Sequence, residues 1–133
     1  MTLIEMMGVS VLIAVLAGMA TIGYRMVINR TKDQTLDDRF RAVATAIQFY
    51  EIDNGVYPSN LNDLLKVSIS GSPYLPELPR DPYLETGGGT AQSQSLDWNA
   101  SKRLLRSAGP DARRFTSDDI CFHVQQLTRV TCQ

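Results

Sequence analysis

Histidine and cysteine are scarce in this chain, which has 133 residues, one His (His123) and two Cys (Cys121 and Cys132). The cysteines are not spaced as Cys-x-x-Cys, so the usual ligand pattern of a zinc site is missing. A nucleophilic catalytic centre needs a base, and the one His falls on an expected strand, on the opposite side from Phe122. We therefore expect no catalytic residue and predict that the protein is not an enzyme.

Nucleotide-binding motifs and an excess of positive charge are also missing. The chain contains neither G-x-x-x-x-G-K-[ST] nor G-x-G-x-x-G. Its 13 Lys and Arg residues are balanced by 14 Asp and Glu residues, which gives a net charge of −1. The sequence therefore gives no basis for nucleotide binding and no electrostatic basis for contact with nucleic acid.

Charged residues are absent from Met6–Tyr24, and proline is absent from residues 1–57. As a helix at about 1.5 Å per residue, this uncharged run would cover roughly the 30 Å hydrocarbon core of a bilayer. No basic residue precedes the run and Thr21–Arg25 is a poor cleavage site, so a signal peptide is disfavoured. We expect a transmembrane or filament-core helix segment over residues 1–25 and a periplasmic or extracellular globular domain over residues 26–133.

Glu5 lies at the edge of this uncharged run. One interpretation places its carboxylate at a membrane interface, facing the headgroups. The other pairs it with a cation inside an apolar environment, because an unpaired buried carboxylate costs several kcal/mol. The nearest plausible cation is the α-amine of Met1 in another copy, and both interpretations stay open at this point.

The helical pattern continues past the uncharged run. Five apolar residues recur at helical spacing and form one stripe: Leu36, Phe40, Val43, Ile47 and Tyr50. We predict one helix from about residue 2 to about residue 52, with Asp53-Asn54-Gly55 as its stop signal. A short helix containing Leu61, Leu64 and Leu65 is expected next.

The last third of the chain predicts short strands over residues 93–98, 102–107, 120–125 and 128–132. The predicted fold class is α+β, with a long N-terminal α-helix packed on a small antiparallel β-sheet. Cys121 and Cys132 would then close a C-terminal hairpin, because two cysteines in an exported chain usually pair. Gly87-Gly88-Gly89 predicts a flexible loop.

The N-terminal residues Met1-Thr2-Leu3-Ile4-Glu5, followed by the apolar run, resemble the mature N-terminus of type IV pilins and of the pseudopilins of type II secretion. The resemblance implies a type IV pilin fold, removal of a basic leader by a prepilin peptidase and N-methylation of Met1. It also implies that Glu5 neutralises the N-terminal amine of a neighbouring subunit. The helix would remain in the bacterial inner membrane until the subunit enters a filament.

Two further stretches are similar to this superfamily. Tyr50–Pro58 resembles the Y-x-x-D-N-x-x-Y-P segment that closes the long helix, and Leu78–Tyr83 resembles the L-P-x-D-P-W segment of major pseudopilins, with Tyr83 in place of Trp. Many members have a Pro near position 22, where this chain has Ile22. Local unwinding of the helix would depend here on Gly18 and Gly23.

Three acids, Asp111, Asp118 and Asp119, lie in one loop between expected strands. From charge alone, a solvated turn with capping Asp residues is the leading interpretation. The loop is similar, however, to the calcium loop of major pseudopilins. That resemblance implies Ca²⁺ held by the side chains of Asp111, Asp118 and Asp119 and by the backbone oxygens of Ala108 and Thr116. Arg113 and Arg114 depart from the pattern, and they would either weaken Ca²⁺ binding or pair with the acids in place of the metal.

Asn99 begins an N-x-S sequon, with Asp97 two residues before it. Bacterial oligosaccharyltransferases prefer an acid at that position. A chance match is the default interpretation, and glycosylation of Asn99 is the alternative.

The resemblance implies a structural subunit of a helical filament, like the major pseudopilin whose pseudopilus drives protein secretion across the outer membrane. A major type IV pilin, serving adhesion, motility or DNA uptake, is the first alternative, and the C-terminal cysteine pair favours it. A monomeric, membrane-anchored periplasmic binding domain is the second. The implied partners are other copies of the chain, the inner membrane, the prepilin peptidase, the assembly platform and minor pilins. The expected location is the bacterial inner membrane, then a periplasmic or cell-surface filament.

Overall fold

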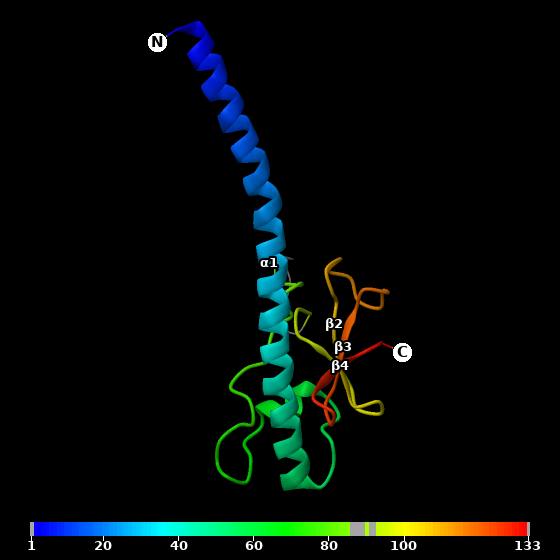
Figure 1. Cartoon of the computed structure of the whole chain (residues 1–133). Coiled ribbons are helices and arrows are strands. Elements are labelled where there is room, and N and C mark those ends of the chain that lie inside the picture. The colour runs from blue at the N-terminus through cyan, green and yellow to red at the C-terminus, as the bar shows by residue number, and fades with distance from the viewer. Residues whose placement is uncertain (1, 86–89, 91–92, 133) are drawn as a thin grey trace. The chain divides into compact units, whose positions relative to one another are not determined.

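The computed structural model describes residues 2–85, 90 and 93–132, without the side chains of residues 20–22 and 25. The elements follow the order α1 (Leu3–Asn54), η1 (Leu61–Leu65, a 3-10 helix), β1 (Asp97–Asn99), β2 (Leu104–Ser107), β3 (Ile120–His123) and β4 (Thr128–Val130) (Figure 1). The predicted α+β class is confirmed, and the four strands lie within or overlap the predicted ranges but are shorter. The predicted loop over Gly87–Gly89 and the N-terminal Met1 lie outside the described residues.

The chain divides into two compact units, and the division falls within α1. The first unit is Met1–Asp33 and contains the N-terminal part of the helix. The second unit is Gln34–Gln133 and contains the rest of α1, η1 and the sheet.

Helix α1 begins and ends close to the predicted positions. It has no proline, and it is helical through Gly18 and Gly23. The amide of Gly55 donates to the carbonyl of Glu51 (2.7 Å), and Gly55 adopts a positive φ of 72°. Since glycine adopts this left-handed conformation without a Cβ clash, Gly55 ends the helix as the sequence predicts.

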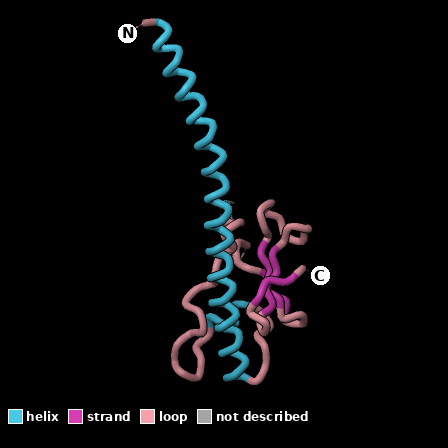
Figure 2. The backbone as a smooth tube through the Cα atoms, viewed as in Figure 1, coloured by secondary structure: helices cyan, strands magenta, loops and turns pink. Residues whose placement is uncertain are grey.

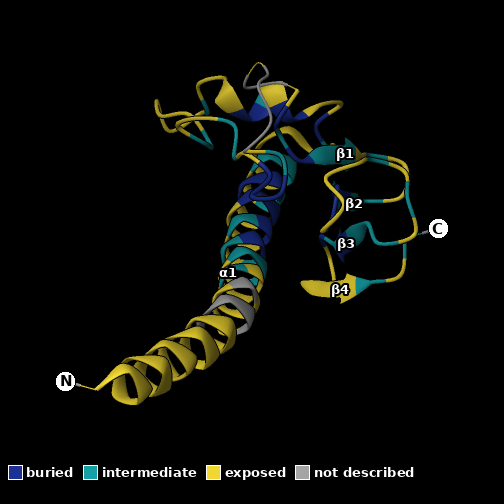
Figure 3. Cartoon of the chain, turned by 90° about the horizontal axis from the view of Figure 1, so that it is seen from above, coloured by how far each residue is buried: buried dark blue, intermediate teal, exposed yellow. Residues whose placement is uncertain are grey.

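The core of the second unit forms on the predicted apolar stripe of α1. Leu36, Phe40, Val43 and Ile47 are fully buried, and the burial colours of Figure 3 show this side of the helix as dark blue. The Phe40 ring stacks on that of Phe122 in β3, with 5.2 Å between the ring centroids. The stripe therefore packs α1 against the sheet, as the predicted packing of the long helix on a small antiparallel sheet requires.

The sheet is antiparallel and has the order β1-β2-β3-β4 among the described residues (Figure 3). Figure 2 draws its strands in magenta beside the cyan helix. Leu105 in β2 pairs with Trp98 in β1 and with Phe122 in β3. Burial in β3 does not alternate, because the neighbouring residues Cys121 and Phe122 are both buried.

A disulfide joins Cys121 in β3 to Cys132, which follows β4, and this confirms the predicted closure of the hairpin. The two cysteines are 11 residues apart in the chain. A cross-link that closes a loop of this size stabilises the folded state mainly by restricting the unfolded chain, by roughly 3 kcal/mol.

Replacing both cysteines by serine is expected to lower the free energy of unfolding by about 2–4 kcal/mol. Urea denaturation of the wild type and of the double variant, each with and without a reducing agent, measures this loss. Reduction should destabilise the wild type and leave the double variant unchanged. Equal unfolding midpoints for the oxidised and reduced wild type would contradict the expected role of the bond.

Among the described residues, no helix combines the length and the apolar character that crossing a bilayer requires. The membrane-spanning helix expected over residues 1–25 therefore has no support from the structure.

Candidate assembly site and acidic loop

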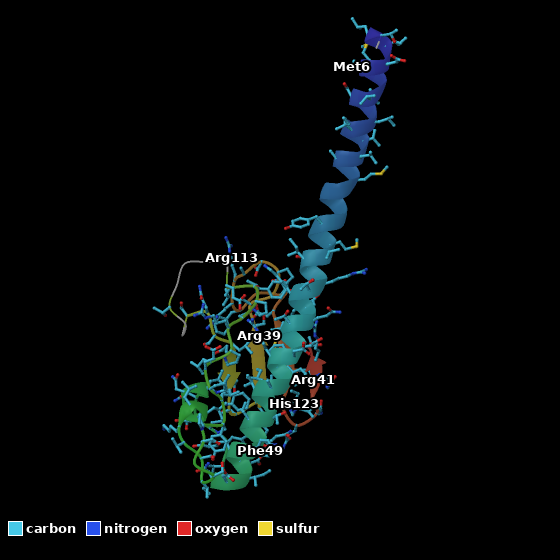
Figure 4. The ribbon with its side chains drawn as sticks, turned by 90° about the vertical axis from the view of Figure 1, so that its left-hand side faces the viewer. Met6, Arg39, Arg41, Phe49, Arg113 and His123 are labelled. Atoms are coloured by element: carbon cyan, nitrogen blue, oxygen red, sulfur yellow. A yellow bond between two sulfur atoms is a disulfide. The ribbon has the colours of Figure 1, made fainter. Side chains whose placement is uncertain are left out.

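The described part of α1 in the first unit exposes large apolar side chains on every side of the helix. Figure 3 shows this part in yellow, and Met6 lies near its N-terminal end (Figure 4). The exposed large apolar residues are Leu3, Ile4, Met6, Met7, Val9, Val11, Leu12, Ile13, Val15, Leu16, Met19, Tyr24, Met26 and Val27. A helix that is apolar all round is normally covered, so this segment is a candidate surface for assembly.

Glu5 closes the first turn of α1 in the isolated chain. Its carboxylate oxygen Oε2 accepts a hydrogen bond from the amide of Thr2 (2.8 Å), and the Glu5 amide donates to the carbonyl of Thr2 (3.1 Å). A Glu three residues after a Thr is the acidic member of a capping box, and its charge also favours a helix N-terminus. This local role is not among the roles expected for Glu5 from the sequence, although the T-x-x-E spacing signals it.

The acidic loop, residues 108–119, is held by hydrogen bonds to its own carboxylates. Oδ2 of Asp118 accepts from the amide of Asp111 (3.0 Å), and Oδ2 of Asp119 accepts from the amide of Phe115 (2.8 Å). The Thr116 hydroxyl lies 2.7 Å from Oδ1 of Asp118 and 3.2 Å from Oδ1 of Asp119. The acids thus shape the loop by accepting bonds from it.

Gly109 allows the two ends of the acidic loop to approach closely. Its φ is +66°, and a Cβ added there would lie 2.1 Å from the backbone oxygen of Asp118. No side chain fits at that distance, so glycine is required at this position. Ala112 and Phe115 also have positive φ values, of 55° and 66°, which are uncommon outside glycine.

Each predicted calcium ligand takes part in hydrogen bonds of the protein itself. Asp118 and Asp119 accept bonds from loop donors, and Oδ1 of Asp111 accepts from the amide of Arg113 (2.8 Å). The amide of Ala108 donates to a fourth acid, Asp81 (2.8 Å), and the Thr116 carbonyl accepts from the Asp119 amide. Within the described residues, no group of three or more His, Cys, Asp or Glu side chains is placed to hold a metal. The structure therefore gives no support for the calcium site, which stays a prediction.

Arg114, one of the two arginines that depart from the calcium-loop pattern, bonds to backbone carbonyls. The guanidinium of Arg114 donates to the carbonyls of Ser93 (3.0 Å) and Ser95 (2.5 Å). Arg106 in β2 forms an ion pair with one of the acids, since its Nε lies 3.8 Å from Oδ2 of Asp119. Its guanidinium also lies 4.9 Å from the ring centroid of Phe115. Sequence alone did not single out Arg106, because it comes from a neighbouring strand.

The hydrogen bond from the Thr116 hydroxyl is the main reason why the pKa of Asp118 is lowered. The charged carboxylate therefore stabilises the fold at pH values above its ordinary pKa of 3.8, and this contribution is lost as the pH falls through the lowered pKa. Thr116→Val should raise the pKa of Asp118 toward 3.8. The fall in melting temperature between pH 5 and pH 3 should then be smaller than in the wild type.

Thr45→Val is a matched control for Thr116→Val, because Thr45 is exposed on α1 and its hydroxyl donates to the carbonyl of Arg41. This control should keep the acid sensitivity of the wild type. Carbon-detected NMR titration of the Asp118 carboxyl gives the pKa directly, and an unchanged pKa in Thr116→Val would contradict the assigned cause.

Asp81 is a buried carboxylate, 1% exposed, that the sequence-based argument did not select. Its Oδ1 accepts from the Ser107 hydroxyl (2.9 Å) and the Tyr83 amide (3.0 Å), and its Oδ2 accepts from the Ala108 amide (2.8 Å). The side chain thereby ties the segment after Pro79 to the end of β2 and the start of the acidic loop.

Asp81→Asn is expected to lower the free energy of unfolding by about 1–3 kcal/mol, since the new amide NH₂ would face backbone donors and leave a buried group unsatisfied. Asp38→Asn changes an exposed carboxylate on α1 in the same way and should shift stability by less than about 0.5 kcal/mol. Urea denaturation of both variants measures the change in the free energy of unfolding. Equal losses of stability in the two variants would contradict the stabilising role of the hydrogen bonds around Asp81.

Asn99 and His123 are two further positions that the sequence singles out. Asn99 is exposed at the end of β1, and its side-chain oxygen accepts from the amide of Lys102 (3.0 Å). Its glycosylation stays a prediction. His123 lies in β3, and its buried Nδ1 has no hydrogen-bond partner in the described part of the chain.

Comparisons with known proteins give no match: no protein-family model, no curated protein and no solved structure is similar to this chain. The resemblance carried by the N-terminal motif therefore stays a prediction.

Proposed function

We propose that the chain is a structural subunit that polymerises through the N-terminal part of α1 into a helical, pilus-like filament. The observation that carries the proposal is the all-round apolar surface of α1 between Leu3 and Val27. Covering such a surface is strongly favourable, at about 25 cal/mol per Å² of apolar area removed from water. Copies of the same segment are the partners that would cover it in a filament.

In the proposed assembly, Glu5 is the charged side chain that each copy pairs with a neighbouring copy. The first Lys or Arg in the chain is Arg25, so the apolar segment before it contains no side-chain cation for the acid. If neighbouring copies cover the helix, the carboxylate leaves water and needs a positive partner. The α-amine of Met1 in a neighbouring subunit would supply it.

The resemblance of the N-terminal residues supports a filament of the major pseudopilin kind within a type IV pilin fold. A major type IV pilin is the second candidate, and the Cys121–Cys132 disulfide favours it, because the C-terminal region of such pilins is often closed by a disulfide. Both candidates share the proposed assembly by α1, and both place the second unit outside the cytoplasm.

Electron microscopy of the purified full chain, after dilution of the detergent in which it is prepared, tests the proposal. We expect filaments of uniform diameter with a regular repeat along their length. A monodisperse monomer under every assembly condition would overturn the filament and favour a single-copy binding domain.

A further inference from the structure

The exposed apolar side chains of the second unit are concentrated in one short stretch. Among its described residues, eight large apolar side chains are exposed, and six of them belong to the stretch Phe49–Ile69. The six are Phe49, Ile52, Val56, Leu65, Val67 and Ile69. Such clustering marks a surface that binds a partner more often than scattered exposure does.

Phe49 and Ile52 are three residues apart and share one side of α1 near its end, and Val56 follows directly after Gly55, where the helix has ended. Their exposed fractions are 58%, 75% and 61%, in contrast with the fully buried core stripe. Figure 4 labels Phe49 on the last turns of the helix. This end of α1 therefore carries a second apolar stripe that the core of the unit does not cover.

A groove of about 520 Å³ adjoins this stripe. Phe49 and Asp53 line it from α1, and Ile69, Pro73, Tyr74 and three serines line it from the loop that follows η1. We call it the helix-end groove. Its walls are mostly apolar or hydroxyl-bearing, and Asp53 is the one charged residue among those that line it.

The loop wall of the helix-end groove is organised by its own hydrogen bonds. The amide of Ser68 donates to the carbonyl of Ser72 (2.9 Å), and the amide of Gly71 donates to the carbonyl of Ser68 (3.0 Å). The Tyr74 hydroxyl donates to Oδ2 of Asp53 (2.8 Å), which ties the loop to α1. A partner would thus meet a preformed surface, which lowers the entropy cost of binding.

Asp53 supplies the charge that selects the partner. The carboxylate is exposed, and the structure records no ion pair for it among the described residues. A complementary segment therefore needs apolar side chains beside a cation. Tyr24–Arg30 has this composition: Tyr24, Met26 and Val27 are exposed, and the segment has two arginines and no acid.

We propose that the helix-end groove binds the segment Tyr24–Arg30 of a second copy of the chain, with Arg30 opposite Asp53. The inference rests on the proposed filament and adds a specific contact between the second unit of one copy and the helix of another. Burial of the apolar side chains would hold the copies together, and the charge pair would select the register.

A charge-exchange experiment on the full chain tests the contact. Asp53→Arg and Arg30→Asp, each alone, should reduce the sedimented fraction after detergent dilution at least about tenfold, because like charges then face each other. The double variant Asp53→Arg/Arg30→Asp should recover the wild-type fraction to within about threefold. Glu77→Arg makes the same charge change at an exposed site outside the groove and should assemble normally.

The outcomes separate this contact from the filament itself. If the wild type assembles and Asp53→Arg assembles equally well, the groove contact is overturned and the filament stands. If each single variant fails to assemble and the double variant does not recover assembly, the pairing of Arg30 with Asp53 is also overturned. A wild type that never assembles overturns both, and near-UV circular dichroism of each variant shows that the second unit is still folded.

Discussion

Glu5→Gln is expected to reduce the polymerised fraction of the full chain at least about tenfold. Glutamine keeps an oxygen that accepts from the Thr2 amide, so the first turn of α1 stays closed. It removes the charge that the proposed partner, a neighbouring α-amine, requires once both groups leave water. An amine left unpaired in an apolar environment costs several kcal/mol, which is more than a tenfold change in association. Sedimentation after detergent dilution measures the loss.

The glutamine variant separates two roles of the same side chain. Assembly of Glu5→Gln at the wild-type level, together with loss of assembly in Glu5→Ala, would mean that the acid acts as a helix cap alone. Glu77→Gln makes the same substitution on the surface of the second unit and should assemble normally. Circular dichroism of all three variants should show unchanged helix content.

Phe40→Ala is expected to lower the free energy of unfolding by about 3–5 kcal/mol, the largest stability loss that we predict for one substitution. The Phe40 side chain is fully buried and stacks on Phe122, so its removal leaves a cavity between α1 and β3. Many domains are stable by only about 5–15 kcal/mol, so the variant should unfold at a clearly lower urea concentration.

Phe49→Ala is the matched control, because it deletes the same atoms from the same helix at a position that is 58% exposed. Its stability should change by less than about 0.5 kcal/mol. Because Phe49 lines the helix-end groove, the same variant should lower assembly. Equal destabilisation by the two substitutions would contradict the assignment of the buried and exposed sides of α1.

The sequence predicts the helix, the strands and the disulfide because these depend on local patterns. The recurrence from Leu36 to Ile47 at helical spacing identifies the buried side of α1, and the absence of proline before Pro58 identifies the length of the helix. Gly55 marks its end. Cys121 and Cys132 lie on either side of a hairpin, where the register of β3 with β4 brings them together.

The network around Asp81 and the partners of the acidic loop could not be predicted in the same way. Asp81 meets Ser107 and Ala108, 26 and 27 residues later in the chain, and nothing local in the sequence signals that contact. From charge alone the three loop acids predict a solvated turn, and a cation among them is implied only by the resemblance of the loop. The folded loop instead supplies backbone amides and the Thr116 hydroxyl as donors, and Arg106 reaches it from β2.

Hydrogen exchange of the full chain, measured by mass spectrometry before and after assembly, tests the central claim most directly. The account predicts that amides in Leu3–Val27 exchange at least about a hundredfold more slowly in the assembled state, because neighbouring copies cover the apolar side chains and suppress opening of the helix. Amides of the buried core, such as Phe40 and Leu105, should change little. Equal exchange of Leu3–Val27 in the dispersed and assembled states would contradict assembly through this helix.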